Sequence, residues 1–221
     1  MRRAIYALIV FSYAFAYAQD VHPITGRPYA GVMGVGGAPW LTRPEREEEE
    51  HPDKALDDIG IVKGSTVADI GAGSGAITWR LAKRVGPTGK VYANDIQARM
   101  LELLRQNMAQ RKITNVETVL GAADDPKLPP ASVDLELLID VYHEFSHPQE
   151  MLRHLRESLK PDGRLVLLEY RGEDPAVPIR PEHKMTVAMV KAELEPEGFR
   201  LDKTIEDLPR QHILIFKIQA R

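Results

Sequence analysis

Short apolar runs alternate along the chain with segments in which apolar residues recur every three or four positions. The runs are rich in Val, Ile and Leu, which is typical of strands buried on both faces of a sheet. The segments between them have the spacing of amphipathic helices. Strands are predicted over 66–70, 90–95, 116–120, 133–139 and 164–169, and helices over 76–85, 99–110 and 148–159.

This alternation predicts a doubly wound α/β domain, because parallel strands need helical crossovers that cover both faces of the sheet. The pattern changes near the C-terminus. A helix over 185–194 is followed by two consecutive apolar strands, 198–204 and 212–218. The connection between these strands is too short for a crossover, so we expect them to form an antiparallel hairpin.

The N-terminal segment stands apart from this pattern. It has a basic start, an apolar run from Ala4 to Ala16 and a small-x-small sequence that ends at Ala18. This is the layout of a secretory signal peptide, and the run is shorter than the roughly 20 residues of a membrane-spanning helix. We expect an exported protein, periplasmic or secreted, that is cleaved after Ala18 and then has no stable membrane insertion. An uncleaved N-terminal anchor is the alternative.

Residues 19–44 are rich in Gly and Pro, which predicts an irregular arm rather than a long helix or a central strand. Its apolar residues Tyr29, Met33, Trp40 and Leu41 are expected to pack on the domain. Residues 45–60 have a helical pattern that starts with the acidic run 45–50, which is expected to be solvated. The length of 221 residues therefore fits one domain over 45–221 with an N-terminal extension.

The amino-acid composition excludes several classes of function. The chain has 29 basic and 32 acidic residues and a net charge of -3, so it carries no basic footprint for nucleic acid. It has no cysteine, which excludes disulfides, thiolate metal sites and a cysteine nucleophile.

The residues with the clearest chemistry follow the predicted strands. Strand 66–70 leads into Gly71-x-Gly73-x-Gly75, where glycines allow a tight turn and a close approach of ligand to backbone. Asp95 ends the second strand, where a carboxylate can accept hydrogen bonds from both hydroxyls of a ribose. Asp124 follows the third strand, where a polar side chain can contact an adenine amino group. Asp140 follows the fourth, at the edge of the sheet where ligands bind.

With these motifs the chain resembles the class I S-adenosylmethionine-dependent methyltransferases. Residues 67–75 are similar to the first motif of the family, Asp95 to its ribose-binding acid, and Asp124 to its adenine-contacting acid. Residues 159–164 are similar to the family's turn into strand five, and the resemblance covers about residues 55–218.

The resemblance implies a seven-stranded sheet of order 3-2-1-4-5-7-6, with strand seven antiparallel and helices on both faces. It also implies S-adenosyl-L-methionine as the cofactor. The cofactor-binding residues that it implies are Asp69, Gly71, Ala72, Gly73, Gly75, Asp95, Ile96, Ala123, Asp124 and Asp140.

A nicotinamide-dependent enzyme is an alternative, because its fold also has a glycine turn after the first strand. The glycines of this chain are more closely spaced than those of G-x-G-x-x-G. The Lys160–Gly163 turn and the final antiparallel strands also favour the methyltransferase.

His143-Glu144-Phe145-Ser146-His147 matches the H-E-x-x-H motif of zinc metallopeptidases, and an exported peptidase is therefore an alternative. That motif needs a helix, which places both histidines on one face. His143 directly follows a buried strand, and Pro148 cannot lie in a helix interior. We therefore expect no metal site here.

Tyr142, His143 and Glu144 are instead expected to face the methyl acceptor. One of them is the candidate for positioning or deprotonating the acceptor; the competing hypothesis is that this segment only shapes the cofactor edge. No substrate domain is inserted, so a small-molecule acceptor is favoured over a polymer. The sequence leaves open the acceptor, the atom that is methylated and the oligomeric state. A protein that binds the cofactor without turnover is the remaining alternative.

Overall fold

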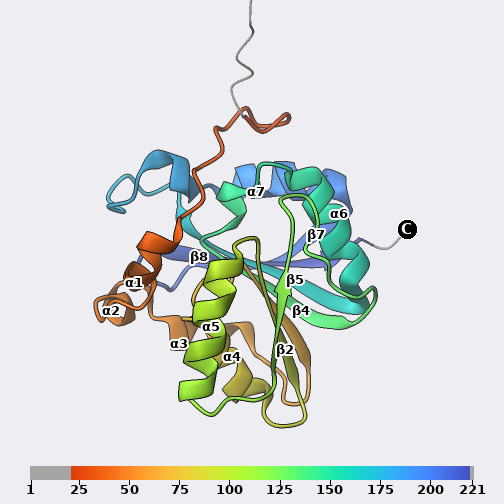
Figure 1. The fold of residues 1–221 in the computed structure, drawn as a ribbon. Coiled ribbons are helices and arrows are strands. Elements are labelled where there is room, and N and C mark those ends of the chain that lie inside the picture. The colour runs from red at the N-terminus through yellow and green to blue at the C-terminus, as the bar shows by residue number, and fades with distance from the viewer. Residues whose placement is uncertain (1–20, 220–221) are drawn as a thin grey trace, which may run out of the picture.

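One mixed β-sheet runs through the molecule and has helices on both faces (Figure 1). The computed structural model describes residues 21–219, so the predicted signal peptide lies outside the described residues. The strand order is β3-β2-β1-β4-β5-β8-β7, with β6 beside β5. The strands are β1 (Thr66–Ile70), β2 (Lys90–Asp95), β3 (Val116–Leu120), β4 (Val133–Ile139), β5 (Leu159–Arg171), β6 (Lys184–Met185), β7 (Phe199–Ile205) and β8 (Gln211–Ile218).

This sheet confirms the predicted topology. Strands β3, β2, β1, β4 and β5 pair in parallel, and β8 lies antiparallel between β5 and β7. When the short β6 is left out and β7 and β8 are counted as strands six and seven, the order is the predicted 3-2-1-4-5-7-6. The sequence pattern missed β6 because it is only two residues long and pairs with the end of β5 through Tyr170 and Arg171.

A layer of helices covers each face of the sheet, and these helices are α3 (Pro52–Ile59), α4 (Thr78–Val85), α5 (Ala98–Gln110), α6 (Pro148–Ser158) and α7 (Val187–Leu194). Alternate residues of a strand point to opposite faces, and the buried residues of β1 show this division. Val67 packs in the cluster that contains α3 and α4, whereas Ala68 packs in the cluster that contains α6 and α7. Helix α5 covers the α4 side near the glycine loop.

Two predicted elements differ from the structure by more than two residues. The helix expected over 45–60 is divided into α2 (Arg46–Glu50) and α3, because His51 adopts a left-handed conformation with φ of 50° and Pro52 then starts the next helix. Proline is suited to the first turn of a helix, where its missing N–H needs no partner. Strand β5 begins at Leu159 instead of residue 164, and its pairing with β4 has an irregular register between Val133 and Leu135.

The arm contains two short helices, η1 (Val35–Gly37) and α1 (Ala38–Leu41), and is anchored by a buried ion pair. Arg27 donates from Nε to Oε1 of Glu193 at 2.9 Å and from Nη2 to Oε2 at 3.0 Å, and Glu193 belongs to α7. A third bond runs from Nη1 of Arg27 to the backbone oxygen of His143 at 3.0 Å. The arm is thereby fixed to both α7 and the loop after β4.

Between residues 21 and 219, no helix is both long enough and apolar enough to cross a membrane.

Candidate active site

A cavity opens at the carboxyl ends of the central parallel strands. Its volume is about 940 Å³ when the open space at its mouth is included. The glycine loop, the loop after β4 and the arm form its walls. Of the predicted cofactor-binding residues, those that line it are Gly71, Gly73, Asp95, Ile96, Ala123 and Asp140.

The glycine loop forms a narrow cradle. Gly71 and Gly73 have φ of 70° and 54°, a left-handed conformation that side chains of other residues disfavour. A Cβ atom on Gly71 would collide with the side chain of Val141, and one on Gly73 would lie 2.8 Å from Leu41 Cδ1. The backbone of the glycine loop therefore packs against the loop after β4 at Gly71 and against the arm at Gly73. Because these two glycines have no side chains, a ligand can approach the peptide groups of the loop directly.

Asp95 joins the second strand to this loop. Its Oδ2 atom accepts a hydrogen bond from the N–H of Gly73 at 2.9 Å, and Oδ1 accepts one from the N–H of Gln97 at 2.8 Å. Burial raises the pKa of Asp95, while these backbone donors act in the opposite direction. The carboxylate is thus held in a fixed orientation at the cavity wall, which suits hydrogen bonds from the two hydroxyls of a cofactor ribose.

Four of the predicted cofactor-binding residues lie outside this lining. Asp69 is buried beneath the loop, and Ala72 donates its N–H to the oxygen of Asn94 at 2.9 Å. Gly75 packs toward Leu104 of α5, since a Cβ atom there would lie 2.9 Å from Leu104 Cγ. Asp124 lies on the exposed loop after β3, next to Ala123.

The carboxyl group of Asp69 is buried and accepts a hydrogen bond from Thr78 Oγ1 at 2.6 Å. Burial raises its pKa to about 7, despite the Thr78 hydrogen bond and the charge of Arg46, which lower it. The folded protein therefore keeps this proton up to a higher pH than the unfolded chain does.

This difference in pKa predicts that the ionisation of Asp69 lowers the free energy of unfolding as pH rises. Asp69→Asn removes the ionisable group and with it this pH dependence. Because the folded pKa is raised, the contribution of Asp69 to the free energy of unfolding is greatest below pH 4 and falls as pH rises to about 7. The fall should be roughly 3–5 kcal/mol for a shift of this size. Urea unfolding of the native protein and of Asp69→Asn between pH 4 and 8 measures this fall. The free energy of unfolding of the native protein should decrease relative to that of the variant as pH rises. Parallel pH profiles of the two proteins would show the prediction to be wrong.

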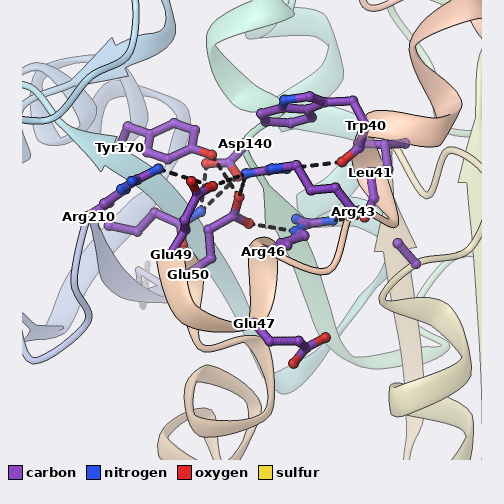
Figure 2. A network of polar contacts seen from close by, with 12 residues as sticks. Trp40, Leu41, Arg43, Arg46, Glu47, Glu49, Glu50, Asp140, Tyr170 and Arg210 are labelled. Atoms are coloured by element: carbon purple, nitrogen blue, oxygen red, sulfur yellow. Dashed lines mark hydrogen bonds and ion pairs between the residues drawn. The ribbon is translucent and has the colours of Figure 1, made fainter.

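A network of charged residues borders the cavity beside Asp140 (Figure 2). Arg46 pairs with Glu50 at 2.5 Å, and Tyr170 donates its hydroxyl to Glu50 at 3.0 Å. The expectation of a solvated acidic run is thus wrong for Glu50, whose side chain is buried against β5. The network attaches α2 to the sheet and places Arg46 in the cavity wall.

Asp140 has a φ of 53° and accepts two hydrogen bonds from Nε2 of Gln211, at 2.8 and 2.7 Å. Burial raises its pKa well above the ordinary value, and the nearby carboxylates Glu50 and Glu169 add to this shift. The sequence placed Asp140 at the cavity, but it did not indicate that Arg46, Glu50 and Tyr170 contact one another.

The three candidate residues after Asp140 lie in different environments. Tyr142 is fully buried under the arm, with the guanidinium carbon of Arg27 5.3 Å from the centre of its ring. His143 is buried too, and its Nδ1 atom lies 2.6 Å from Oε2 of Glu169. Burial disfavours the charged form of His143, but the charge of Glu169 raises its pKa overall. Glu144 is the one of the three that lines the cavity, and burial raises its pKa to about 7.

The H-E-x-x-H segment is not one helix. Tyr142–Glu144 is a single turn of 3-10 helix, and the chain becomes extended at Phe145. His147 is exposed, with its Nδ1 atom 3.0 Å from the hydroxyl of Ser146. The two histidines do not share a helical face, so the arrangement does not favour the zinc peptidase.

The fold, the glycine cradle and the oriented Asp95 are those of a class I, Rossmann-like methyltransferase. Residues 61–208, about two thirds of the chain, match the family model described as a methyltransferase domain. The chain therefore belongs to this methyltransferase family, and its cofactor is S-adenosyl-L-methionine. This confirms the prediction of both family and cofactor.

Its relatives include ubiquinone/menaquinone biosynthesis C-methyltransferases. Those of Pseudomonas savastanoi pv. phaseolicola and Pseudomonas aeruginosa strain LESB58 are each 33% identical to it, over 117 and 112 residues. These matches cover 52% and 50% of this chain, and 46% and 44% of the relatives. The chain thus spans about half the length of the curated relatives it matches.

Solved structures agree on the fold. A SAM-dependent methyltransferase from Aquifex aeolicus has a TM-score of 0.80 and 28% identity, and the match covers 85% of this chain and all of that one. The [4+2]-cyclase SpnF has a TM-score of 0.64 at 14% identity, over 77% of this chain and 81% of that one. Since a cyclase shares it, the fold by itself does not define the reaction.

Proposed function

We propose that this protein transfers the methyl group of S-adenosylmethionine to a small-molecule acceptor by in-line displacement. The observation that carries the proposal is the composition of the cavity wall. Beside the polar residues Arg46, Asp140 and Glu144, the wall includes apolar side chains of the arm, the loop after β4 and α6, namely Met33, Trp40, Phe145 and Met151. A wall of aromatic and sulfur-containing side chains suits an acceptor with an apolar or aromatic body.

In this reaction the acceptor atom attacks the methyl carbon from the side opposite the sulfur. The bond from carbon to sulfur breaks, its electron pair stays on sulfur, and S-adenosylhomocysteine leaves. Orientation of the two reactants can contribute on the order of 7–11 kcal/mol to such a step. Asp95 and the glycine loop hold the donor, while the arm and the loop 142–147 hold the acceptor and exclude water.

Base assistance by His143, Glu144 or Tyr142 stays a prediction. Geometry favours Glu144, because its side chain lines the cavity and those of the other two do not. An acceptor that loses a proton on methylation, such as an alcohol or an ammonium group, would require such a base, whereas a thiolate or phenolate would not.

The experiment is a screen for release of S-adenosylhomocysteine from the purified protein. The panel should contain thiols, phenols, amines and aromatic intermediates of quinone biosynthesis, since the relatives are C-methyltransferases named for that pathway. We expect at least one acceptor to give turnover. Tight binding of S-adenosylmethionine by calorimetry, with no product from any acceptor, would instead support a binding protein without turnover.

A further inference from the structure

His143, Glu144 and His183 bring their side chains together from two segments about 40 residues apart. One potential metal-ligand atom from each residue lies within 4.8 Å of the other two. The Nε2 atom of His143 is 3.0 Å from the Nδ1 atom of His183, and the two rings meet edge to face with their centroids 4.9 Å apart. His183 belongs to the turn η3 (Pro181–His183), at the end of the connection that follows β5.

The cluster has the support that a metal-binding histidine requires. His143 contacts Glu169 through Nδ1 at 2.6 Å, and the other oxygen of Glu169 accepts the N–H of Tyr142 at 3.0 Å. Glu169 is completely buried in β5, so it cannot turn toward solvent. Donation from Nδ1 to this carboxylate leaves the Nε2 lone pair directed at His183. A carboxylate that orients an imidazole in this way is the usual outer partner of a metal-bound histidine.

We propose that His143, Glu144 and His183 form a binding site for a divalent transition-metal ion, with Glu169 as the positioning residue. Two imidazoles and one carboxylate are the ligands that Zn²⁺ and its first-row neighbours accept. Three protein ligands leave a coordination position open for water or another ligand. The proposal differs from the expectation from the sequence, which was that the H-E-x-x-H segment holds no metal.

The histidine that lies beside His143 comes from outside the H-E-x-x-H motif. His147 is exposed and contacts Ser146, and His183 lies against His143 in its place. A metal would therefore use His143 and Glu144 of that motif but not His147. The inference goes beyond the proposed methyl transfer and does not rest on it, although Glu144 also lines the cavity and would place the ion at the cavity wall.

The test is a titration of the untagged, chelator-treated protein with Co²⁺, followed through the visible absorption of the bound ion and by competition with Zn²⁺. We expect one saturable site whose affinity falls at least about ten-fold in His143→Ala and His183→Ala. His147→Ala is the matched control and should bind as the native protein does. Glu169→Gln should weaken binding by roughly 10- to 100-fold.

Circular dichroism of every variant checks that the loss of binding is not a loss of fold; His183, on a half-buried turn, is the substitution that disturbs the core least. The proposal is overturned if the protein shows no saturable binding, if His183→Ala binds as well as the native protein, or if affinity depends on His147. Metal binding is measured here without any acceptor, so its failure is distinct from a failure of the methyl-transfer screen.

Discussion

Replacing Asp95 by Ala is expected to weaken the binding of S-adenosylmethionine by at least about 100-fold. The carboxylate is positioned to accept hydrogen bonds from both ribose hydroxyls, and each bond to a charged group contributes about 1.5–3 kcal/mol. The substitution also leaves the N–H groups of Gly73 and Gln97 without their acceptor, which loosens the glycine loop. Isothermal titration calorimetry gives the dissociation constant directly.

Asp124→Ala is the matched control for this experiment, because it also removes one carboxylate near the predicted adenine position. Asp124 is exposed and does not line the cavity, whereas Asp95 does. Its substitution should therefore weaken binding much less. A loss in Asp95→Ala no larger than that in Asp124→Ala would contradict the assignment of Asp95 to the ribose.

Replacing Glu193 by Gln is expected to lower the free energy of unfolding by about 3–5 kcal/mol, the usual cost of removing one partner of a buried ion pair. Arg27 would then keep its charge with no counter-charge beside it, since its side chain and that of Glu193 are 5% and 0% exposed. His22 also contacts Glu193, with 3.3 Å between Nε2 and Oε2. Urea unfolding measures the loss, and limited proteolysis should cut the arm faster in the variant.

Glu195→Gln is the control for Glu193, because it lies on the turn after α7 and its contact with Lys191 is exposed and 3.8 Å long. Such exposed pairs contribute about 0–1 kcal/mol. The double variant Arg27→Met, Glu193→Met should recover much of the stability, because it leaves no unpaired charge in the interior. Equal effects of Glu193→Gln and Glu195→Gln would show that the arm is not held by this pair.

The anchoring of the arm has a consequence for the site. Met33, Trp40 and Leu41 of the arm line the cavity, and Gln97 donates to the backbone oxygen of Met33 at 2.9 Å. Release of the arm in Glu193→Gln should therefore weaken cofactor binding as well as stability, even though Glu193 does not line the cavity. Calorimetry on the folded variant at low temperature separates these two effects.

The sequence by itself determined the fold, because the fold depends on local patterns with fixed spacing, and the resemblance of its motifs to those of the methyltransferases implied the cofactor. Apolar strands alternating with amphipathic segments required a parallel sheet with helices on both faces, and the terminal hairpin followed from its short connection. Gly71, Gly73 and Asp95 could be located because they follow strands directly, and carboxyl ends of parallel strands meet at one edge.

Only the tertiary structure decided which side chains meet across long stretches of chain. Arg27 and Glu193 are 166 residues apart, and Tyr170 and Glu50 are 120 residues apart, so no periodicity relates them. The burial of Glu50 depends on its partners Arg46 and Tyr170, which hold one residue of an otherwise exposed acidic run in the interior. In the same way His183, and not His147 of the local motif, lies against His143, because the chain turns extended at Phe145 and the connection after β5 returns to the loop after β4.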